Sequence, residues 1–256
     1  MMYKIAKQIA VVVVSLWLVA CTTAGGTRPT THVAPDPKAA EINMRLGLNY
    51  LQRGEYEIAL EKLEKSLKQN PTLPSAHNTI ALLYQQLGQI DKAEYHFKKA
   101  ISYQPNYSEA QNNYGVFLCQ QKQYEEAEQH FLLAVKNPLY NSSAQAYENA
   151  GMCANRIPDQ TRAEAYFRKA LQLNKNLSKS LLQMAKLRFL DIDYDNANSY
   201  IQRYKAIAQW SPSSLFTAIQ ISNKLNDQDA VASYALLLKS RFPDSDEAQK
   251  VKKGQY

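Results

Sequence analysis

The sequence is poor in several residue types, and each shortage excludes a class of protein. Only 3 of its 256 residues are Cys, too few for a disulfide framework. Only 8 are Gly and 10 are Pro, which argues against collagen-like chains and many-turned β architectures. At 45% hydrophobic and 21% charged residues, the chain fits neither wholesale disorder nor a multi-span membrane protein. The formal net charge of +7 comes from Lys and Arg spread along the chain, so it predicts no nucleic-acid interface.

The first twenty residues have the pattern of a targeting signal. Lys4 and Lys7 precede an apolar run over residues 9–20. Twelve residues at about 1.5 Å each cannot cross a hydrocarbon core of about 30 Å, so the run is a signal-peptide core and not a membrane span. The segment Leu18-Val19-Ala20-Cys21 resembles the lipobox of bacterial lipoproteins. That resemblance implies cleavage before Cys21 and acylation of its new amino terminus, which would anchor the protein durably in lipid.

The residues after Cys21 indicate a tether and a destination. In bacterial lipoproteins an Asp after the cysteine retains the protein at the inner membrane, and here Thr22 stands there. The resemblance thus implies the outer membrane, with the body facing the periplasm. Residues 21–38 are rich in Thr, Gly, Pro and Ala without an apolar period, which predicts a flexible tether. A plain secretory signal, with Cys21 incidental, is the alternative. We expect a signal peptide over 1–20, a tether over 21–38 and a folded body over 39–252.

An internal period of 34 residues runs through that body. The landmarks at this spacing are Tyr50 and Tyr84; Gly54 and Gly88; Ala59, Ala93 and Ala127; Pro71 and Pro105; Phe97 and Phe131. The pattern resembles the tetratricopeptide repeat, a helical hairpin that stacks in series. The resemblance implies an all-α fold, a right-handed α-solenoid of about six hairpins. The candidate repeats are 40–73, 74–107, 108–141, 144–177, 178–210 and 211–244.

Small residues explain why the pattern recurs. Gly47, Ala81 and Gly115 fall where the first helix of a hairpin touches the second, and a larger side chain there would push the helix axes apart. A single hairpin cannot bury its apolar face alone, so stacking builds one continuous core. In this family the first helices line a concave groove.

Catalytic and metal-binding patterns are not found. The sequence has no HExxH, GxSxG or glycine-rich phosphate loop. His96 and His130 occupy the same position in adjacent repeats, which places them on separate second helices without a partner that completes a metal site. Glu125, Glu126 and Glu128 are surrounded by amides and lysines and predict a solvated face. We therefore expect no enzyme, cofactor, metal or small-molecule substrate.

Cys119 and Cys153 lie 34 residues apart, and two readings of them stay open. In an oxidising periplasm they could form a disulfide. Neighbouring helix axes are about 8–10 Å apart, whereas a disulfide requires Cα atoms within about 7 Å. This comparison favours two buried thiols, since Cys packs as a small apolar residue.

Groove-facing positions can be assigned from the repeat family, at the second, fifth, ninth, twelfth and thirteenth residues of each first helix. The predicted partner-binding residues are Met44, Leu48 and Leu51 in repeat 1, Asn78 and Leu82 in repeat 2, and Asn112 and Val116 in repeat 3. The first three form an apolar stripe that suits a helix or an extended peptide from another protein. Alternatively these side chains belong to the core, or the tether covers them.

Three further segments narrow the family. Residues 112–119, 148–153 and 241–245 resemble corresponding runs in the type IV pilus biogenesis lipoproteins of the PilF/PilW family. That resemblance covers the whole chain and implies a non-enzymatic pilotin, which helps the pilus secretin reach the outer membrane and multimerise there, in support of twitching motility. Two other lipoprotein roles stay open: a scaffold for β-barrel assembly and a regulator of a cell-wall enzyme.

Overall fold

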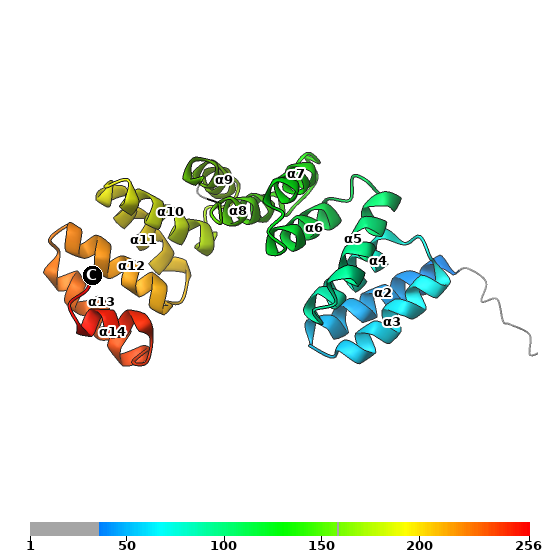
Figure 1. The fold of residues 1–256 in the computed structure, drawn as a ribbon, viewed down its shortest axis with the longest axis horizontal. Helices are drawn as coiled ribbons and strands as arrows, with labels where there is room; N and C mark the ends of the chain where they lie inside the picture. Colours follow the sequence, from blue (N-terminus) through cyan, green and yellow to red (C-terminus); the bar gives the residue numbers. More distant parts are fainter. Residues whose placement is uncertain (1–35, 158) are drawn as a thin grey trace, which may run out of the picture. The chain divides into compact units, whose positions relative to one another are not determined.

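The computed structural model describes residues 36–157 and 159–256, so Cys21, the signal peptide and most of the expected tether lie outside it. Within the described residues the chain forms thirteen α-helices and no strand, which confirms the predicted all-α solenoid (Figure 1). The helices are α2 (Pro37–Gln52), α3 (Tyr56–Gln69), α4 (Pro74–Gln86), α5 (Ile90–Tyr103), α6 (Ser108–Gln120), α7 (Tyr124–Val135), α8 (Ser143–Ala154), α9 (Gln160–Leu173), α10 (Ser178–Leu190), α11 (Tyr194–Ile207), α12 (Pro212–Lys224), α13 (Gln228–Arg241) and α14 (Asp246–Lys252).

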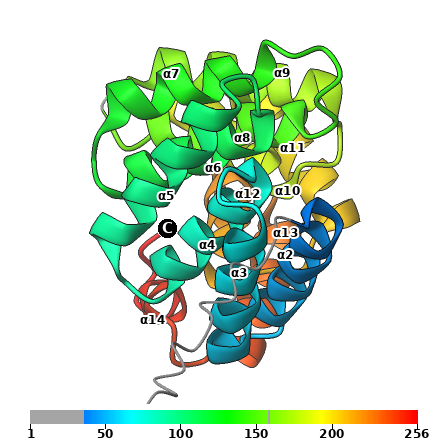
Figure 2. The ribbon, with the colours of Figure 1, turned by 90° about the vertical axis from the view of Figure 1, so that its right-hand side faces the viewer.

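The helices pair into six hairpins, from α2–α3 to α12–α13, and a single helix α14 follows. Each first helix also contacts the first helix of the next hairpin, from α2 against α4 to α12 against α14. Figures 1 and 2 follow this order from blue α2 to red α14. Because the first helices contact one another in series, their side chains form one continuous wall.

The first helix begins slightly earlier than the sequence predicts. Asp36 accepts a hydrogen bond from the Ala39 backbone N–H at 3.0 Å, and Pro37 is the first helical residue. An N-cap aspartate followed by proline is a strong helix start, because proline has the required φ and lacks only an N–H that would stay unpaired there. The last two residues assigned to the tether are therefore helical.

Glycines allow close contact within three hairpins. A Cβ atom on Gly47 would lie 2.5 Å from Leu63, and one on Gly151 would lie 2.7 Å from Phe167. A Cβ on Gly115 would meet the Phe131 ring at 2.9 Å. These separations are too short for carbon atoms, so the first and second helices approach this closely only where the side chain is missing.

In five of the hairpins the turn contains a residue with a left-handed backbone. Gly54 and Gly88 occupy this position with φ of 77° and 68°. In later repeats the same position is taken by Lys122, Ile192 and Asn226, with φ between 60° and 64°. Glycine and asparagine tolerate this backbone, whereas a β-branched residue such as Ile192 is strained in it.

The sixth repeat begins at residue 212, one residue later than the sequence register places it. Helix α12 starts at Pro212, and Val231 of α13 is buried at the repeat position of Ala59 and Ala93, which a start at residue 211 would give to Ala230. With this shift Asn226 matches the left-handed turn position, and Pro243 matches the prolines that end the first two repeats. The small residues expected in this hairpin are thus replaced by larger ones.

A recurring hydrogen bond links each of these prolines to the next first helix. The carbonyl oxygen of Pro71 accepts from His77 at 3.0 Å, and that of Pro105 accepts from Gln111 at 2.7 Å. The carbonyl of Pro243 accepts in the same way from Gln249 of α14 at 3.4 Å. Helix α14 therefore stands where the first helix of a seventh repeat would, and it covers the core of the sixth.

Candidate partner-binding groove

A row of side-chain amides runs along the first helices from α4 to α8. Asn113 donates to Asn78 at 3.2 Å, and Asn149 donates to Asn112 at 3.0 Å. Asn112 and Asn113 are joined at 3.4 Å, and Gln145 donates to Asn149 at 3.3 Å. This amide row connects three repeats, and it presents hydrogen-bonding groups of the type that recognise a peptide backbone.

Two members of the amide row were predicted from the sequence. Asn78 and Asn112 are only 6% and 8% exposed, so much of their hydrogen-bonding capacity is used within the protein. Asn113 and Asn149 were not predicted. Both lie next to a buried residue of their helix, outside the five positions that the repeat family assigns to the groove.

The predicted apolar stripe is only partly exposed. Met44 and Leu51 are half-buried and pack against the core, and Leu48 is also half-buried. Leu82 and Val116 of the next two repeats pack against the core in the same manner. These residues form an apolar wall that is open on one side.

The first helix has a second apolar face that the sequence analysis missed. Ile42 and Leu46 are 59% and 39% exposed. In the repeat register they match Ala76 and Ile80 of the second repeat, which are 0% and 2% exposed. The same two repeat positions are therefore buried in the second repeat and exposed in the first. Comparing the first repeat with the second in the repeat register could have identified this exposed face.

Cys119 and Cys153 form a disulfide, which overturns the expectation of two thiols. Their Cα atoms are 5.9 Å apart, within bridging range. The sequence argument compared helix axes, but each Cα lies about 2.3 Å from its own axis. Residues that face each other across adjacent first helices are therefore several ångströms closer than the axes. The disulfide joins α6 to α8 and lines a small groove cavity of about 90 Å³.

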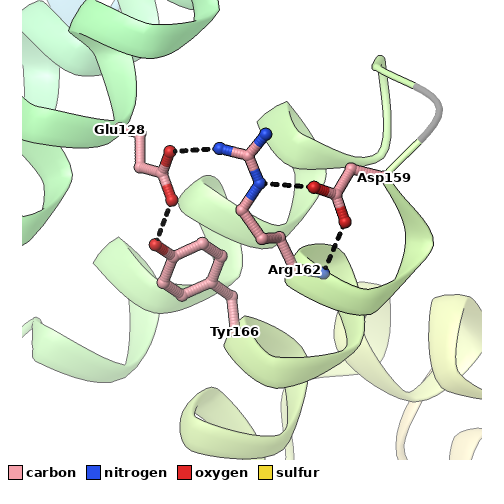
Figure 3. Close-up of polar contacts among 4 residues, drawn as sticks. All are labelled: Glu128, Asp159, Arg162 and Tyr166. Carbon is pink, nitrogen blue, oxygen red and sulfur yellow. Dashed lines mark hydrogen bonds and ion pairs between the residues drawn. The ribbon is translucent and has the colours of Figure 1, made fainter.

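A second connection between repeats 3 and 4 is polar and lies on the second helices (Figure 3). Glu128 of α7 accepts from Arg162 of α9 at 2.8 Å and also from the Tyr166 hydroxyl. Asp159 caps α9 and holds the same guanidinium at 2.6 Å. The expectation of a solvated face was wrong for Glu128. Its partners lie on the next repeat, whereas the prediction considered only the neighbouring residues of its own helix. Burial of the ring, together with the Glu128 carboxylate beside it, raises the pKa of Tyr166.

Glu148 is a buried carboxylate that caps another helix. It is 3% exposed, and one oxygen accepts from the Ser180 backbone N–H at 2.9 Å and from the Ser180 hydroxyl at 2.8 Å. Its other oxygen accepts from Gln145 at 2.9 Å. The negative charge lies at the amino end of α10, where unpaired N–H groups favour it. Glu148 thus connects repeats 4 and 5.

His96 contacts a histidine of its own repeat. His77 Nδ1 and His96 Nδ1 are 2.9 Å apart, and the Tyr84 ring stacks on His96. Burial, reinforced by the nearby His77, lowers the pKa of His96 to about 4, and burial also lowers the pKa of His77. In the next repeat His130 instead meets Gln111 at 2.5 Å. Within residues 36–157 and 159–256 no three His, Cys, Asp or Glu side chains come together in a group that could hold a metal ion.

A cavity of about 680 Å³ lies between the second helices α9 and α11, and its lining includes Arg168, Lys175 and Arg203. Among the described helices, none combines the length and apolar character that a membrane span requires.

Comparisons with known proteins agree with this architecture. Family models described as TPR repeat and tetratricopeptide repeat match residues 47–88, 74–107, 96–129 and 144–177. The chain is 32% identical over 239 residues to type IV pilus assembly protein PilF of Pseudomonas aeruginosa, covering 93% of this chain and 95% of PilF.

Solved structures lead to the same relatives. The structure of Pseudomonas aeruginosa PilF matches with a TM-score of 0.81 and 33% identity, covering 85% of this chain and 98% of that one. The crystal structure of PilW, a widely conserved type IV pilus biogenesis factor, matches with a TM-score of 0.76 and 27% identity, covering 85% of this chain and 100% of that one.

Proposed function

The chain belongs to the family of the type IV pilus assembly protein PilF, and from this premise we propose that it is an outer-membrane lipoprotein that binds the pilus secretin and promotes its localisation and multimerisation. The observation that carries the proposal is the similarity to PilF in sequence over 93% of the chain and in fold at a TM-score of 0.81. The protein would act by binding another polypeptide and would catalyse no reaction itself.

The groove supports a protein partner through two kinds of surface. The half-buried Asn113 and Asn149 of the amide row offer hydrogen bonds to an extended backbone. The half-open wall of Met44, Leu48 and Leu51 offers apolar contact. Ile42 and Leu46 add exposed apolar area on the same helix. Binding sites that combine an apolar centre with flanking polar groups are typical of peptide recognition. We propose that the secretin docks on these first repeats.

The lipid anchor is the second half of the proposal. Acylation of Cys21 would hold the repeats at the outer membrane, and residues 22–35 would separate them from the lipid. Mass spectrometry of the mature amino terminus tests the acylation directly. A Cys21→Ser variant should abolish acylation and leave secretin multimers in the wrong membrane fraction.

The docking surface is tested by single charged substitutions. Leu48→Glu and Ile42→Glu place a carboxylate on the apolar wall and on the exposed face of α2, and both should reduce secretin multimers in outer-membrane fractions. Leu236→Glu is the matched control, because Leu236 is 71% exposed on the second helix α13. Thermal unfolding of each variant shows that it is folded. Normal multimers with both folded α2 variants would exclude this docking surface, and normal multimers in a deletion strain would exclude the proposed function.

A further inference from the structure

A pocket in the groove of the last two repeats has an unusual lysine. The pocket lies between α10 and α12 and has a volume of about 300 Å³. Its lining residues are Lys186, Phe189 and Leu190 from α10 and Ser213, Phe216, Thr217 and Gln220 from α12. This volume is at the lower end of the range that proteins use for small ligands, enough for one large side chain with its neighbours.

Lys186 occupies a position that is apolar in the first three repeats. In the repeat register it corresponds to Leu48, Leu82 and Val116, which were assigned to the groove. A cation has therefore replaced an aliphatic side chain at the centre of the groove wall. The replacement changes which partner residue this part of the groove can accept.

The ammonium group of Lys186 is poorly compensated. Its hydrogen bond within the described residues goes to the Ser213 hydroxyl at 3.0 Å, and the described carboxylates form no ion pair with it. Burial lowers the pKa of Lys186, and Glu247 of α14 opposes this shift from a distance. An ammonium has three N–H donors, so two remain for a ligand. An additional acceptor in the pocket would stabilise the charge that burial disfavours.

The walls of the pocket are apolar and aromatic. Phe189 and Phe216 are partly buried against the core, and Leu190 is 60% exposed. The Lys250 ammonium lies 5.6 Å from the centre of the Phe216 ring. These walls suit a large apolar side chain next to the group that Lys186 binds.

We propose that this pocket binds a peptide segment of a partner protein in which a carboxylate lies beside a large apolar side chain. The single lysine of the lining matches one negative charge, and Glu247 would repel a doubly charged phosphate more strongly than a carboxylate. The pocket belongs to the wall of first helices, which an extended peptide can follow. The inference does not depend on the identity of the partner that docks on the first repeats.

Capped, fluorescent hexapeptides test the proposal by anisotropy with the purified protein. The probe Gly-Ser-Glu-Phe-Ser-Gly should bind about tenfold more tightly than Gly-Ser-Gln-Phe-Ser-Gly, a difference of about 1.4 kcal/mol. Lys186→Met should remove this preference, whereas Lys186→Arg, which keeps the charge, should retain it. Lys239→Met is the matched control, because Lys239 is an exposed lysine on the second helix α13 and should leave binding unchanged.

Two further measurements separate this pocket from other anion sites. Glu247→Gln should tighten the glutamate peptide two- to threefold because a competing negative charge is removed. Inorganic phosphate at millimolar concentration should not displace the peptide. Equal affinity for the two peptides, full binding by folded Lys186→Met, or displacement by phosphate would each overturn the proposal.

Discussion

Acid should destabilise the second repeat through its histidine pair. His77 donates from Nε2 to the Pro71 carbonyl at 3.0 Å, which leaves its Nδ1 as an acceptor for His96, 2.9 Å away. Protonation of His77 at Nδ1 would place two N–H groups face to face, and protonation of both rings would place two positive charges side by side. Protonation of His96 alone, at Nε2, is disfavoured chiefly by burial of the ring. Lys99 adds positive charge beside His77, which further disfavours protonation. The Tyr84 ring that stacks on His96 carries no negative charge that could stabilise a protonated histidine.

The magnitude follows from the pKa of His96. Its pKa is about 4 in the folded protein and 6.5 ordinarily, and at about 1.4 kcal/mol per pKa unit the difference corresponds to about 3 kcal/mol. Because the ring is half-buried, we expect a loss of about 2–3 kcal/mol. The unfolded chain binds the proton more readily, so this contribution to stability is complete above about pH 7. It declines as the pH falls from about 6.5 to about 4.

Urea unfolding of wild type and His96→Gln between pH 7 and pH 4 measures the effect. Glutamine can donate its amide N–H to His77 without titrating. The Gln111–His130 contact of the next repeat shows that a glutamine and a histidine can pair at these two positions, there with the glutamine oxygen accepting. Between pH 7 and pH 4 the free energy of unfolding should fall by about 2–3 kcal/mol less in the variant than in wild type. Carboxylate protonation is common to both proteins and cancels. His130→Gln is the control. It should reduce the pH dependence of the free energy of unfolding less than His96→Gln does, because Glu126 lies 4.0 Å from His130 and favours its charged form. Parallel profiles for His96→Gln and wild type would refute the argument.

Three other sets of substitutions test the hairpin turns and the contacts between repeats. Ile192→Gly should stabilise the protein by about 1 kcal/mol in urea unfolding because it relieves a left-handed β-branched residue, and Lys122→Gly should stabilise it less; destabilisation by Ile192→Gly would contradict the strain. Glu148→Ala should cost about 2–3 kcal/mol and Glu148→Gln clearly less, since the amide keeps one acceptor oxygen; equal losses would contradict the capping role. Replacing Cys119 and Cys153 by Ala should cost about 4 kcal/mol for a loop of 34 residues, and a reducing agent should lower the Tm of wild type but not of the variant.

The fold could be predicted because its determinants repeat. Gly47 and Gly115 recur at the helix contact, and a period of 34 residues fixed which residues face the core. The predicted start of the sixth repeat was wrong by one residue, because the residues that mark the earlier repeats are less regular in it. A start at residue 211 gives Ala230 the position of the earlier alanines, whereas the structure buries Val231 there and aligns Pro243 with the earlier prolines.

The site could be predicted only in part, because its contacts cross between repeats. The register identified Asn78 and Asn112, but the donors Asn113 and Asn149 come from the following repeat. The Glu128–Arg162 pair joins two second helices and leaves no pattern within either helix. Such contacts depend on how closely neighbouring hairpins pack, which a single repeat does not encode.

The covalent and ionic bridges between repeats gather in the middle of the array. The disulfide and Glu128 join repeats 3 and 4, Glu148 joins repeat 4 to repeat 5, and Glu164 of α9 pairs with Arg188 of α10 across the same boundary. In a linear array stability is a sum of repeat and neighbour terms, so these bridges stabilise the centre selectively.

On the described first helices, the large apolar side chains that are most exposed lie instead toward the two ends of the array. Ile42 and Leu46 are exposed on the first helix, and the Lys186 pocket lies between the last two hairpins. Strong bridges fix neighbouring side chains in one arrangement, whereas surfaces that bind a partner must leave apolar groups uncovered until it arrives. This division is the one expected of a protein that holds a polypeptide at separate points along its groove, because a firmly joined centre keeps both contact regions in a fixed register.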